Sequence, residues 1–263
     1  MRHLVASATD TVEEDFAALQ RTLAASPALD RLEAPDATVY WSHLPLVALN
    51  VITDARIPDE DVRRRTHELL APFLERALPF QWITTPATTS PALEAALAQA
   101  GLRAQEYPAM HAALRSPIDP GTPADVYVDV VWPDQVGPVN ATVFNSFGHM
   151  PQVAQVHLEI LESMDPETNH FFLARSLSNG QSLGASTMHT RGDSVMLAGI
   201  STVPAARGRG LERALAGTMM NRAASTGATS ATLVANASTY PTYVELGFRT
   251  QFNVVTWTWQ PEG

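Results

Sequence analysis

The chain has 263 residues, a formal net charge of −10 at pH 7, and neither cysteine nor lysine. The negative charge argues against binding to nucleic acid or to an anionic membrane, because both attract basic surfaces. The lack of cysteine excludes disulfides, thiolate zinc sites and a cysteine nucleophile, and the lack of lysine excludes a Walker-type phosphate loop and a pyridoxal Schiff base. We expect a soluble, cytoplasmic protein with one large or two modest domains.

Apolar spacing and turn residues predict an α/β chain throughout. In the first half, helices are expected at residues 11–25, 59–77 and 91–99, and strands at 38–41, 47–52, 81–84 and 102–114. In the second half, helices are expected at 135–147, 151–161, 210–225 and 239–246, and strands at 126–131, 171–176, 182–189, 195–203 and 230–235. Residues 248–259 fit one long strand or a pair of strands.

A stretch with three prolines and one glycine, residues 116–123, lies between the two halves. Such a composition fits neither a helix nor a central strand, so it is the expected linker. It divides the chain into an N-terminal domain, residues 1–116, and a C-terminal domain, residues 117–263. Both parts have the size of an ordinary domain.

The two halves resemble each other. Gly101-Leu-Arg-Ala-Gln105 and Gly247-Phe-Arg-Thr-Gln251 each follow a predicted short helix and open an extended segment. A duplicated module explains this similarity economically. Chance resemblance of two helix–glycine–strand junctions is the alternative.

The residues around 203–213 predict an anion site. A strand is expected to end near Val203, Pro204 stops the ladder, and two glycines allow a tight turn into the next helix. The first backbone N–H groups of a helix have no partner within it, and the helix dipole adds positive potential. The same segment supplies three arginines and two glycines: Arg207, Gly208, Arg209, Gly210 and Arg213. On its own, such a loop is equally well explained as a structural turn.

Two further segments accompany the loop, Gly227 to Asn236 and Tyr243-Val-Glu-Leu-Gly-Phe248. In order and spacing, residues 195–251 resemble the GNAT superfamily of N-acetyltransferases. Residues 82–114 are similar to the degenerate N-terminal domain of tandem GNAT proteins. The resemblance implies two tandem GNAT-like domains with mixed sheets, of which only the second binds acetyl-CoA.

The resemblance assigns roles to single residues. Acetyl-CoA would be held by the strand end, the loop, the first helical turn and the next strand's asparagine: Ser201, Thr202, Val203, Arg207, Gly208, Arg209, Gly210, Leu211, Glu212, Arg213 and Asn236. Tyr243 would protonate the departing thiolate, with packing beside Phe248 as its structural alternative. An amine attacks the thioester directly, so no serine or cysteine nucleophile is needed, and a strand N–H can stabilise the developing oxyanion.

Glu212 departs from the family pattern, which has glycine or alanine at this position. A glutamate in the first helical turn is favourable for the dipole, and Arg209 or Arg213 could pair with it. A carboxylate also repels phosphates, so weakened cofactor binding or a non-catalytic domain is the alternative. In the first half, the segment equivalent to the phosphate loop is residues 54–61, which has four acids and no glycine. We therefore expect a structural role for that half, such as walling the acceptor pocket.

Other residues carry weaker signals. Phe147, His149 and His189 are candidates for the acceptor side of the site, with a histidine that has no catalytic role as the alternative for His149 and for His189. The eight histidines form no ligand pair at helical spacing, so no metal site is expected. The sequence predicts acetyl transfer from acetyl-CoA to a primary amine of a small molecule or peptide. A catalytically silent protein that senses an acyl-CoA or binds a partner is the alternative, and a homodimer is left open.

Overall fold

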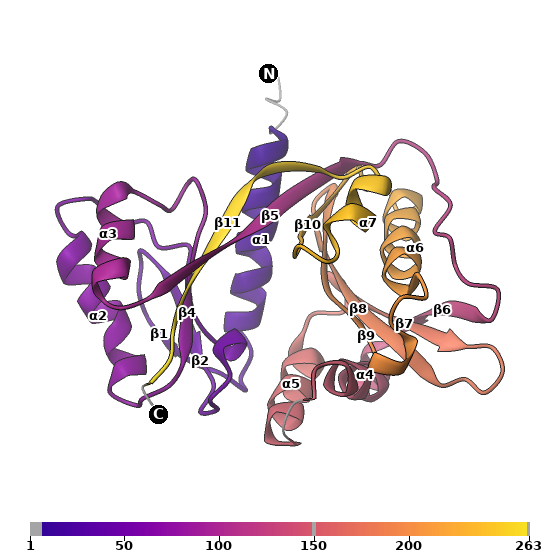
Figure 1. The fold of residues 1–263 in the computed structure, drawn as a ribbon, viewed down its shortest axis with the longest axis horizontal. Coiled ribbons are helices and arrows are strands. Elements are labelled where there is room, and N and C mark those ends of the chain that lie inside the picture. The colour runs from indigo at the N-terminus through magenta and orange to yellow at the C-terminus, as the bar shows by residue number, and fades with distance from the viewer. Residues whose placement is uncertain (1–6, 149–150, 262–263) are drawn as a thin grey trace. The chain divides into compact units, whose positions relative to one another are not determined.

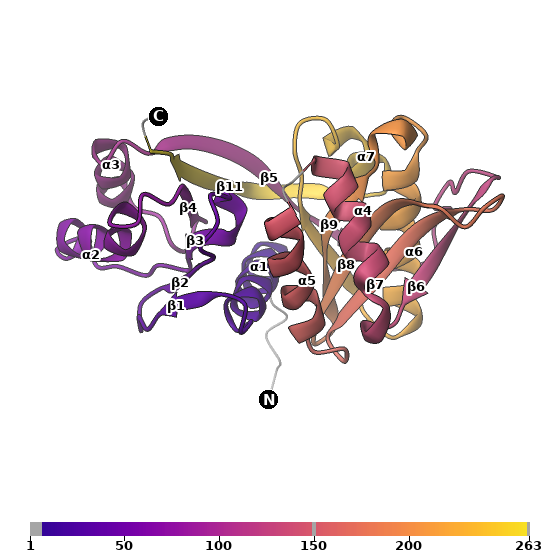
Figure 2. The ribbon, with the colours of Figure 1, turned by 90° about the horizontal axis from the view of Figure 1, so that it is seen from below.

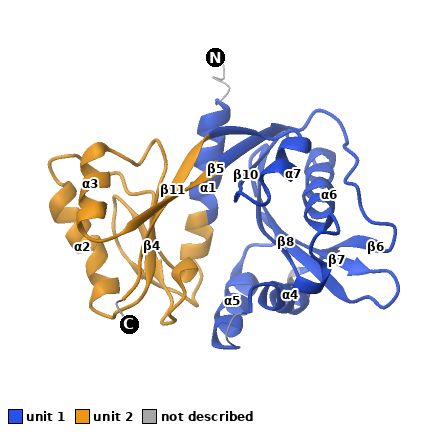
Figure 3. Cartoon of the chain, in the orientation of Figure 1, with its two compact units in different colours: residues 1–19, 109–251 blue, residues 20–108, 252–263 orange. Residues whose placement is uncertain are grey.

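The computed structural model describes residues 7–148 and 151–261, which form two compact units (Figure 3). Unit 1 comprises residues 1–19 and 109–251, and unit 2 comprises residues 20–108 and 252–263. Three elements pass from one unit into the other: α1 (Ala8–Ala24), β5 (Arg103–Ala113) and β11 (Arg249–Trp259). The two units therefore meet along the chain at residues 19/20, 108/109 and 251/252 and not at 116/117, so the division into 1–116 and 117–263 remains a proposal about sequence modules.

Unit 2 is a mixed sheet with two helices. Its strands and helices are β1 (Asp30–Leu32), β2 (Thr38–Trp41), β3 (Asn50–Thr53), α2 (Val62–Leu74), β4 (Phe80–Thr84) and α3 (Pro91–Gln99). The strand order is β1-β2-β3-β4-β11, with β3 parallel to β4 and the other pairs antiparallel. Residues 47–49 form a 3-10 turn where a strand was expected, and the three-residue β1 was not expected. The core centres on Trp82, Phe80 and Phe73. The phenyl rings of Phe73 and Phe80 stack with their centroids 4.8 Å apart.

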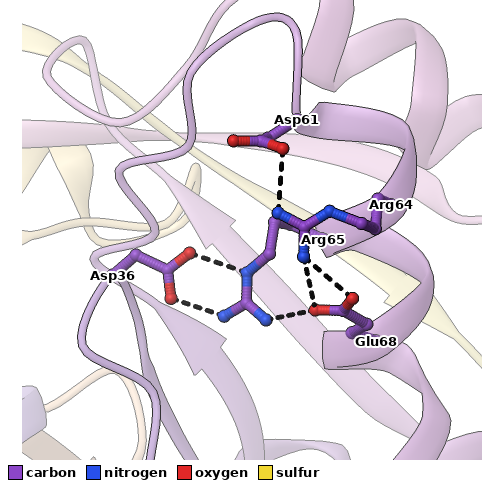
Figure 4. A network of polar contacts seen from close by, with 5 residues as sticks. All are labelled: Asp36, Asp61, Arg64, Arg65 and Glu68. Carbon is purple, nitrogen blue, oxygen red and sulfur yellow. Dashed lines mark hydrogen bonds and ion pairs between the residues drawn. The ribbon is translucent and has the colours of Figure 1, made fainter.

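An ion-pair network ties the start of α2 to the loop before β2 (Figure 4). The Arg65 guanidinium donates to both Asp36 carboxylate oxygens, at 2.8 and 2.5 Å, and also to Glu68. Arg64 donates to Asp61 at 2.8 Å and to Glu68 at 2.9 Å. The arginine beside it holds the pKa of Asp36 below its usual range.

Unit 1 contains the other elements. They are β6 (Val126–Val131), α4 (Gly137–Phe147), α5 (Pro151–Ser163), β7 (Asn169–Ser176), β8 (Ser182–Arg191), β9 (Ser194–Thr202), α6 (Leu211–Ser225), β10 (Ser230–Val234) and α7 (Tyr240–Glu245), with short 3-10 turns at Pro133–Gln135 and Pro204–Ala206. The strand order is β5-β10-β9-β8-β7-β6, in which β9 and β10 are parallel and the other pairs antiparallel.

Helices cover both faces of the unit 1 sheet. Helix α6 packs on β7, β8 and β9 from one side, while α4 packs on the same strands from the other (Figures 1 and 2). Gly184 allows the close approach on the α6 side, because a Cβ there would lie 2.9 Å from the Ser201 carbonyl oxygen and 3.2 Å from a Leu215 methyl group. Because α6 packs directly on β9, the loop that joins them lies at the end of β9, beside the sheet.

Each unit contains one strand from the half of the chain that supplies most of the other unit. Within unit 1, β10 pairs with β5, which comes from the first half of the chain, through Ala109 to Ala113. Within unit 2, β4 pairs with β11, the last strand of the chain, through Val255 to Trp259. If β4 and β10 are equivalent strands of a duplicated module, each pairs with the final strand of the other module. Residues 249–259 thus form one long strand, not a pair.

The proline-rich segment expected to be a linker is attached to α6. The Asn221 side chain accepts from the Ile118 N–H at 2.9 Å and donates to the Ile118 carbonyl at 2.8 Å. A Cβ on Gly217 would lie 2.7 Å from the Pro120 Cα, so this segment packs directly on the helix. The prolines keep this segment out of helices and strands, but it still packs on α6 and is not a flexible linker.

Candidate functional site

The predicted strand–loop–helix segment is present. Strand β9 ends at Thr202, the 3-10 turn Pro204–Ala206 follows, and α6 begins at Leu211. Gly208 and Gly210 have φ values of 75° and 79°, in the left-handed region that favours glycine. Gly210 precedes the first turn and has no side chain to cap it, so the backbone N–H groups of that turn are available to a ligand.

A cavity of about 570 Å³ opens at this segment. It is lined by nine of the predicted cofactor residues: Ser201, Thr202, Arg207, Gly208, Gly210, Leu211, Glu212, Arg213 and Asn236. Two others, Val203 and Arg209, are not among its lining residues, and the Val203 N–H is paired with the Leu183 carbonyl at 2.9 Å. The structure thus brings most of the predicted set around one hollow.

Strand β9 bulges next to the cavity. Ala185 faces Ser201 and Thr187 faces Ala198, so two residues of β9, Gly199 and Ile200, oppose the single Ser186. Gly199 has φ 61°, the conformation that glycine commonly supplies in such a bulge. A bulge takes one residue out of the ladder, and Ile200 lines the cavity. The strand end can therefore present backbone groups to a ligand.

The three arginines of this segment make contacts elsewhere, and among the described residues neither Arg209 nor Arg213 pairs with Glu212, as the sequence had allowed. Arg207 donates to the Ser146 carbonyl at 2.7 Å and Arg209 donates to Asp125 at 2.6 Å. Arg213 donates to Glu245 at 3.3 Å. The Asp125 and Glu245 carboxylates are largely exposed, with 67% and 71% of the side-chain surface accessible, so these two ion pairs are weak and can open.

The Tyr243 hydroxyl donates to Glu212 Oε1 at 2.5 Å. Tyr243 is 5% exposed, packs edge-on against Phe248 with ring centroids 5.9 Å apart, and is not among the cavity's lining residues. Glu212 does line the cavity. Burial, and then the Glu212 carboxylate, raise the pKa of Tyr243 far above its usual value. Burial raises the pKa of Glu212, and the hydrogen bond from Tyr243 opposes this rise.

Asn236 caps the turn before α7. Its Oδ1 atom accepts from the Ser238 N–H at 2.9 Å, the Ser238 hydroxyl at 2.6 Å and the Thr239 N–H at 3.1 Å. These bonds hold the segment that contributes Ser238, Thr239 and Thr242 to the cavity wall, three residues that the sequence analysis missed. The signal for them was the run of hydroxyl side chains between the asparagine and the tyrosine.

The acceptor-side candidates do not cluster. Phe147 lines the cavity with Ser146 and is 58% exposed. His189 is 5% exposed, is not among the lining residues, and lies 2.9 Å from Asn169 Oδ1 through its Nδ1 atom. Burial lowers the pKa of His189, so the structural reading suits it better than a role in the cavity. His149 lies outside the described residues.

Within residues 7–148 and 151–261, no cluster of three or more metal-binding side chains is present. No helix of the described part of the chain has the length and apolar character needed to cross a bilayer.

No protein-family model and no curated protein matches the sequence. Solved structures do resemble the chain. A GCN5-related N-acetyltransferase from Kribbella flavida superimposes with a TM-score of 0.69 at 17% identity over 96% of both chains. One from Sphaerobacter thermophilus gives 0.65 at 16% identity, over 88% of this chain and 84% of the other. A tandem GNAT protein from the clavulanic acid biosynthesis pathway gives 0.57 at 13% identity over 98% of both. Because these matches extend along most or all of the chain, it has the GNAT fold in its tandem form.

Proposed function

We propose that unit 1 is an N-acetyltransferase that moves an acetyl group from acetyl-CoA to a primary amine of a small molecule or peptide. The cavity between the end of β9, the glycine loop and the first turn of α6 is the observation that carries this proposal. Its size is in the range of ligand sites, and its unpaired helical N–H groups suit a pyrophosphate. GNAT neighbours whose names describe acetyltransferases add to it.

The residues fit acetyl-CoA in most respects. The amides of Gly208, Gly210 and the first turn of α6 would bind the pyrophosphate, and the bulged end of β9 would hold the pantetheine arm. Two features count against tight binding, because the Glu212 carboxyl lies in the wall and Arg209 and Arg213 are paired with acids. These ion pairs are exposed, so the arginines can turn to phosphate oxygens at small cost.

The bound thioester supplies an activated acetyl group and a thiolate leaving group. The chain's own task is to position the two reactants, to donate a hydrogen bond to the carbonyl oxygen and to protonate the thiolate. A backbone N–H at the β9 bulge is suited to the second task. The third falls to the Tyr243–Glu212 pair, which combines the tyrosine named by resemblance with the carboxyl it touches. Most of the rate would come from positioning.

The proposal is tested by calorimetric titration of the full chain with acetyl-CoA, using Gly210→Glu and Gly227→Glu variants. Both glycines have positive φ and open space around a Cβ, so both changes bring the same strain and charge. Of these two glycines, Gly210 lines the cavity and Gly227 does not. We expect binding by wild type and by Gly227→Glu, with a loss of at least about 100-fold in affinity for Gly210→Glu, about 3 kcal/mol. Equal binding by both variants would contradict the proposed site.

A catalytically silent acyl-CoA sensor is the second candidate. The paired arginines and the acidic Glu212 favour it, since both weaken the positive potential of the loop. The two candidates separate when binding is followed by a screen of primary amines for thiol release. Because the chain has no cysteine, a thiol-reactive dye reports only the released coenzyme A. Binding without release for any amine would favour the sensor.

A further inference from the structure

Glu212 and Tyr243 form a layered pair at the wall of the cavity. Glu212 is the member that lines the cavity, and the Tyr243 ring lies behind it, 5% exposed and packed against Phe248. The Tyr243 hydroxyl donates to Oε1 of Glu212, so Oε2 is the carboxyl oxygen that this bond does not engage. Of the two acidic groups, the carboxyl is therefore the one that faces the ligand space.

The charged groups around Glu212 are turned elsewhere. Arg213, the next residue of α6, donates to Glu245 on α7. Arg209 in the loop donates to Asp125, and Arg207 donates to the Ser146 carbonyl at the end of α4. No arginine is recorded as a hydrogen-bond partner of Glu212 among the described residues. With no cation bound to it and partial burial, the carboxyl is held in surroundings that favour its protonated form.

We propose that Glu212 is the acid that protonates the leaving thiolate and that Tyr243 positions it, an inference that rests on the proposed acetyl transfer. In the step, the amine nitrogen would bond to the acetyl carbon and the C–S bond of the thioester would break. The O–H bond of Glu212 would break as the S–H bond forms on the departing thiolate, and the negative charge would pass to the carboxylate. The Tyr243 O–H stabilises that carboxylate through the existing hydrogen bond. The attacking amine loses its proton to solvent, and Glu212 is reprotonated from solvent before the next turnover.

The pKa directions agree with this division of roles. An acid works best when its pKa lies near the working pH. Burial raises the pKa of Glu212 toward that range, whereas burial and the adjacent carboxylate move the pKa of Tyr243 far away from it. A buried tyrosine that already donates its proton to Glu212 is a poor proton source for a second acceptor. Its hydrogen bond instead suits Tyr243 to hold the Glu212 carboxyl in position.

The first experiment uses the protein without any ligand. Infrared difference spectra over a pH titration would follow the C=O band of protonated carboxyls in wild type, Glu212→Gln, Tyr243→Phe and Glu162→Gln. Glu162 is an exposed carboxyl on α5 and serves as the control. We expect a component that titrates above the usual glutamate range, is missing in Glu212→Gln alone, and moves to higher pH in Tyr243→Phe. The last shift follows because the tyrosine hydrogen bond lowers the pKa of Glu212.

The second experiment measures thiol release with acetyl-CoA and an accepted amine across pH. Because the acid must be protonated, wild-type kcat should fall as pH rises through the pKa found by infrared spectroscopy. Glu212→Gln should lose about 100-fold or more in kcat with little change in KM, as expected when a general acid is removed. Tyr243→Phe should keep kcat within about tenfold, and its decline should start at higher pH.

Two results would overturn the inference. One is a Glu212→Gln variant with near wild-type kcat while Tyr243→Phe loses about 100-fold, which would make the tyrosine the acid. The other is the absence of the Glu212 carboxyl band. Thermal unfolding of each variant, with Glu212→Ala as a second substitution, separates misfolding from loss of the acid. Failure of wild type to bind acetyl-CoA in the calorimeter would overturn the proposed function itself, and the mechanism with it.

Discussion

Each unit contains a strand that leads through a turn into a helix, β9 to α6 in unit 1 and β3 to α2 in unit 2, but the two turns are built differently. In unit 1, Gly208 and Gly210 leave the first turn of α6 uncapped beside a cavity. In unit 2, residues 54–61 have no glycine, and Asp54 itself adopts φ 49°, a conformation that is strained for a side-chain-bearing residue.

The difference also appears in the charges. Around α2, arginines and acids neutralise each other in the network of Asp36, Arg65 and Glu68, and Arg64 binds Asp61 (Figure 4). Unit 1 thus has a glycine turn beside a cavity, whereas unit 2 has internal ion pairs at the corresponding turn and helix.

The largest expected effect is a loss of stability in unit 2 that leaves unit 1 less affected. Trp257 lies on the last strand of the chain but is buried in the core of unit 2. Trp257→Ala should lower the unfolding free energy of unit 2 by about 3–5 kcal/mol, the range for large aromatic truncations. Hydrogen exchange measured by mass spectrometry should show faster exchange in residues 38–108. Faster hydrogen exchange confined to residues 126–251 would contradict the packing of β11 in unit 2.

A smaller effect tests whether the α2 network is structural. Arg65→Ala removes the bonds to Asp36 and Glu68 from a partly buried guanidinium and should cost about 1.5–3 kcal/mol in denaturant unfolding of unit 2. Arg63→Ala, at an exposed position on the same helix, is the control and should change stability by less than about 0.5 kcal/mol. Acetyl-CoA binding should be unchanged in both. A loss of binding in Arg65→Ala alone would assign unit 2 a part in the cofactor site.

The smallest effect concerns the open turn. Asp125→Asn removes the acid that holds Arg209 and should raise acetyl-CoA affinity about three- to tenfold, about 1 kcal/mol, with a weaker effect at high salt. Asp134→Asn, a change of the same charge on the 3-10 turn before α4, is the control. Calorimetry at two ionic strengths measures both. Unchanged affinity in Asp125→Asn would mean that Arg209 does not reach the phosphates.

Local features of both units were predictable from the sequence. Periodicity and glycine positions predicted the segment from β9 to α6 and most other elements, because these depend on neighbouring residues. The 3-10 turn at Val47–Leu49 was taken for a strand, since short apolar runs do not distinguish the two. The mixed α/β class and the tandem GNAT fold are confirmed by the structure and its neighbours.

Long-range pairings were not predictable. The bond between Glu212 and Tyr243 joins residues 31 positions apart, and Arg209 meets Asp125 across 84 positions. Nothing local in the sequence marks either pairing, so the sequence analysis offered Arg209 or Arg213, and not Tyr243, as a partner of Glu212. The strand partners of β5 and β11 were not predictable for the same reason, because an extended segment can pair with any strand that offers a free edge.

The pairing of β5 and β11 also bears on how such a protein can change over generations. A deletion that removed the first module would take β5 out of the sheet that carries the cavity, leaving β10 with an open edge. A deletion that removed the second would take β11 from the other sheet. Neither module can be discarded without a compensating strand. The first half of the chain would therefore be retained because the sheet that carries the cavity depends on its strand β5.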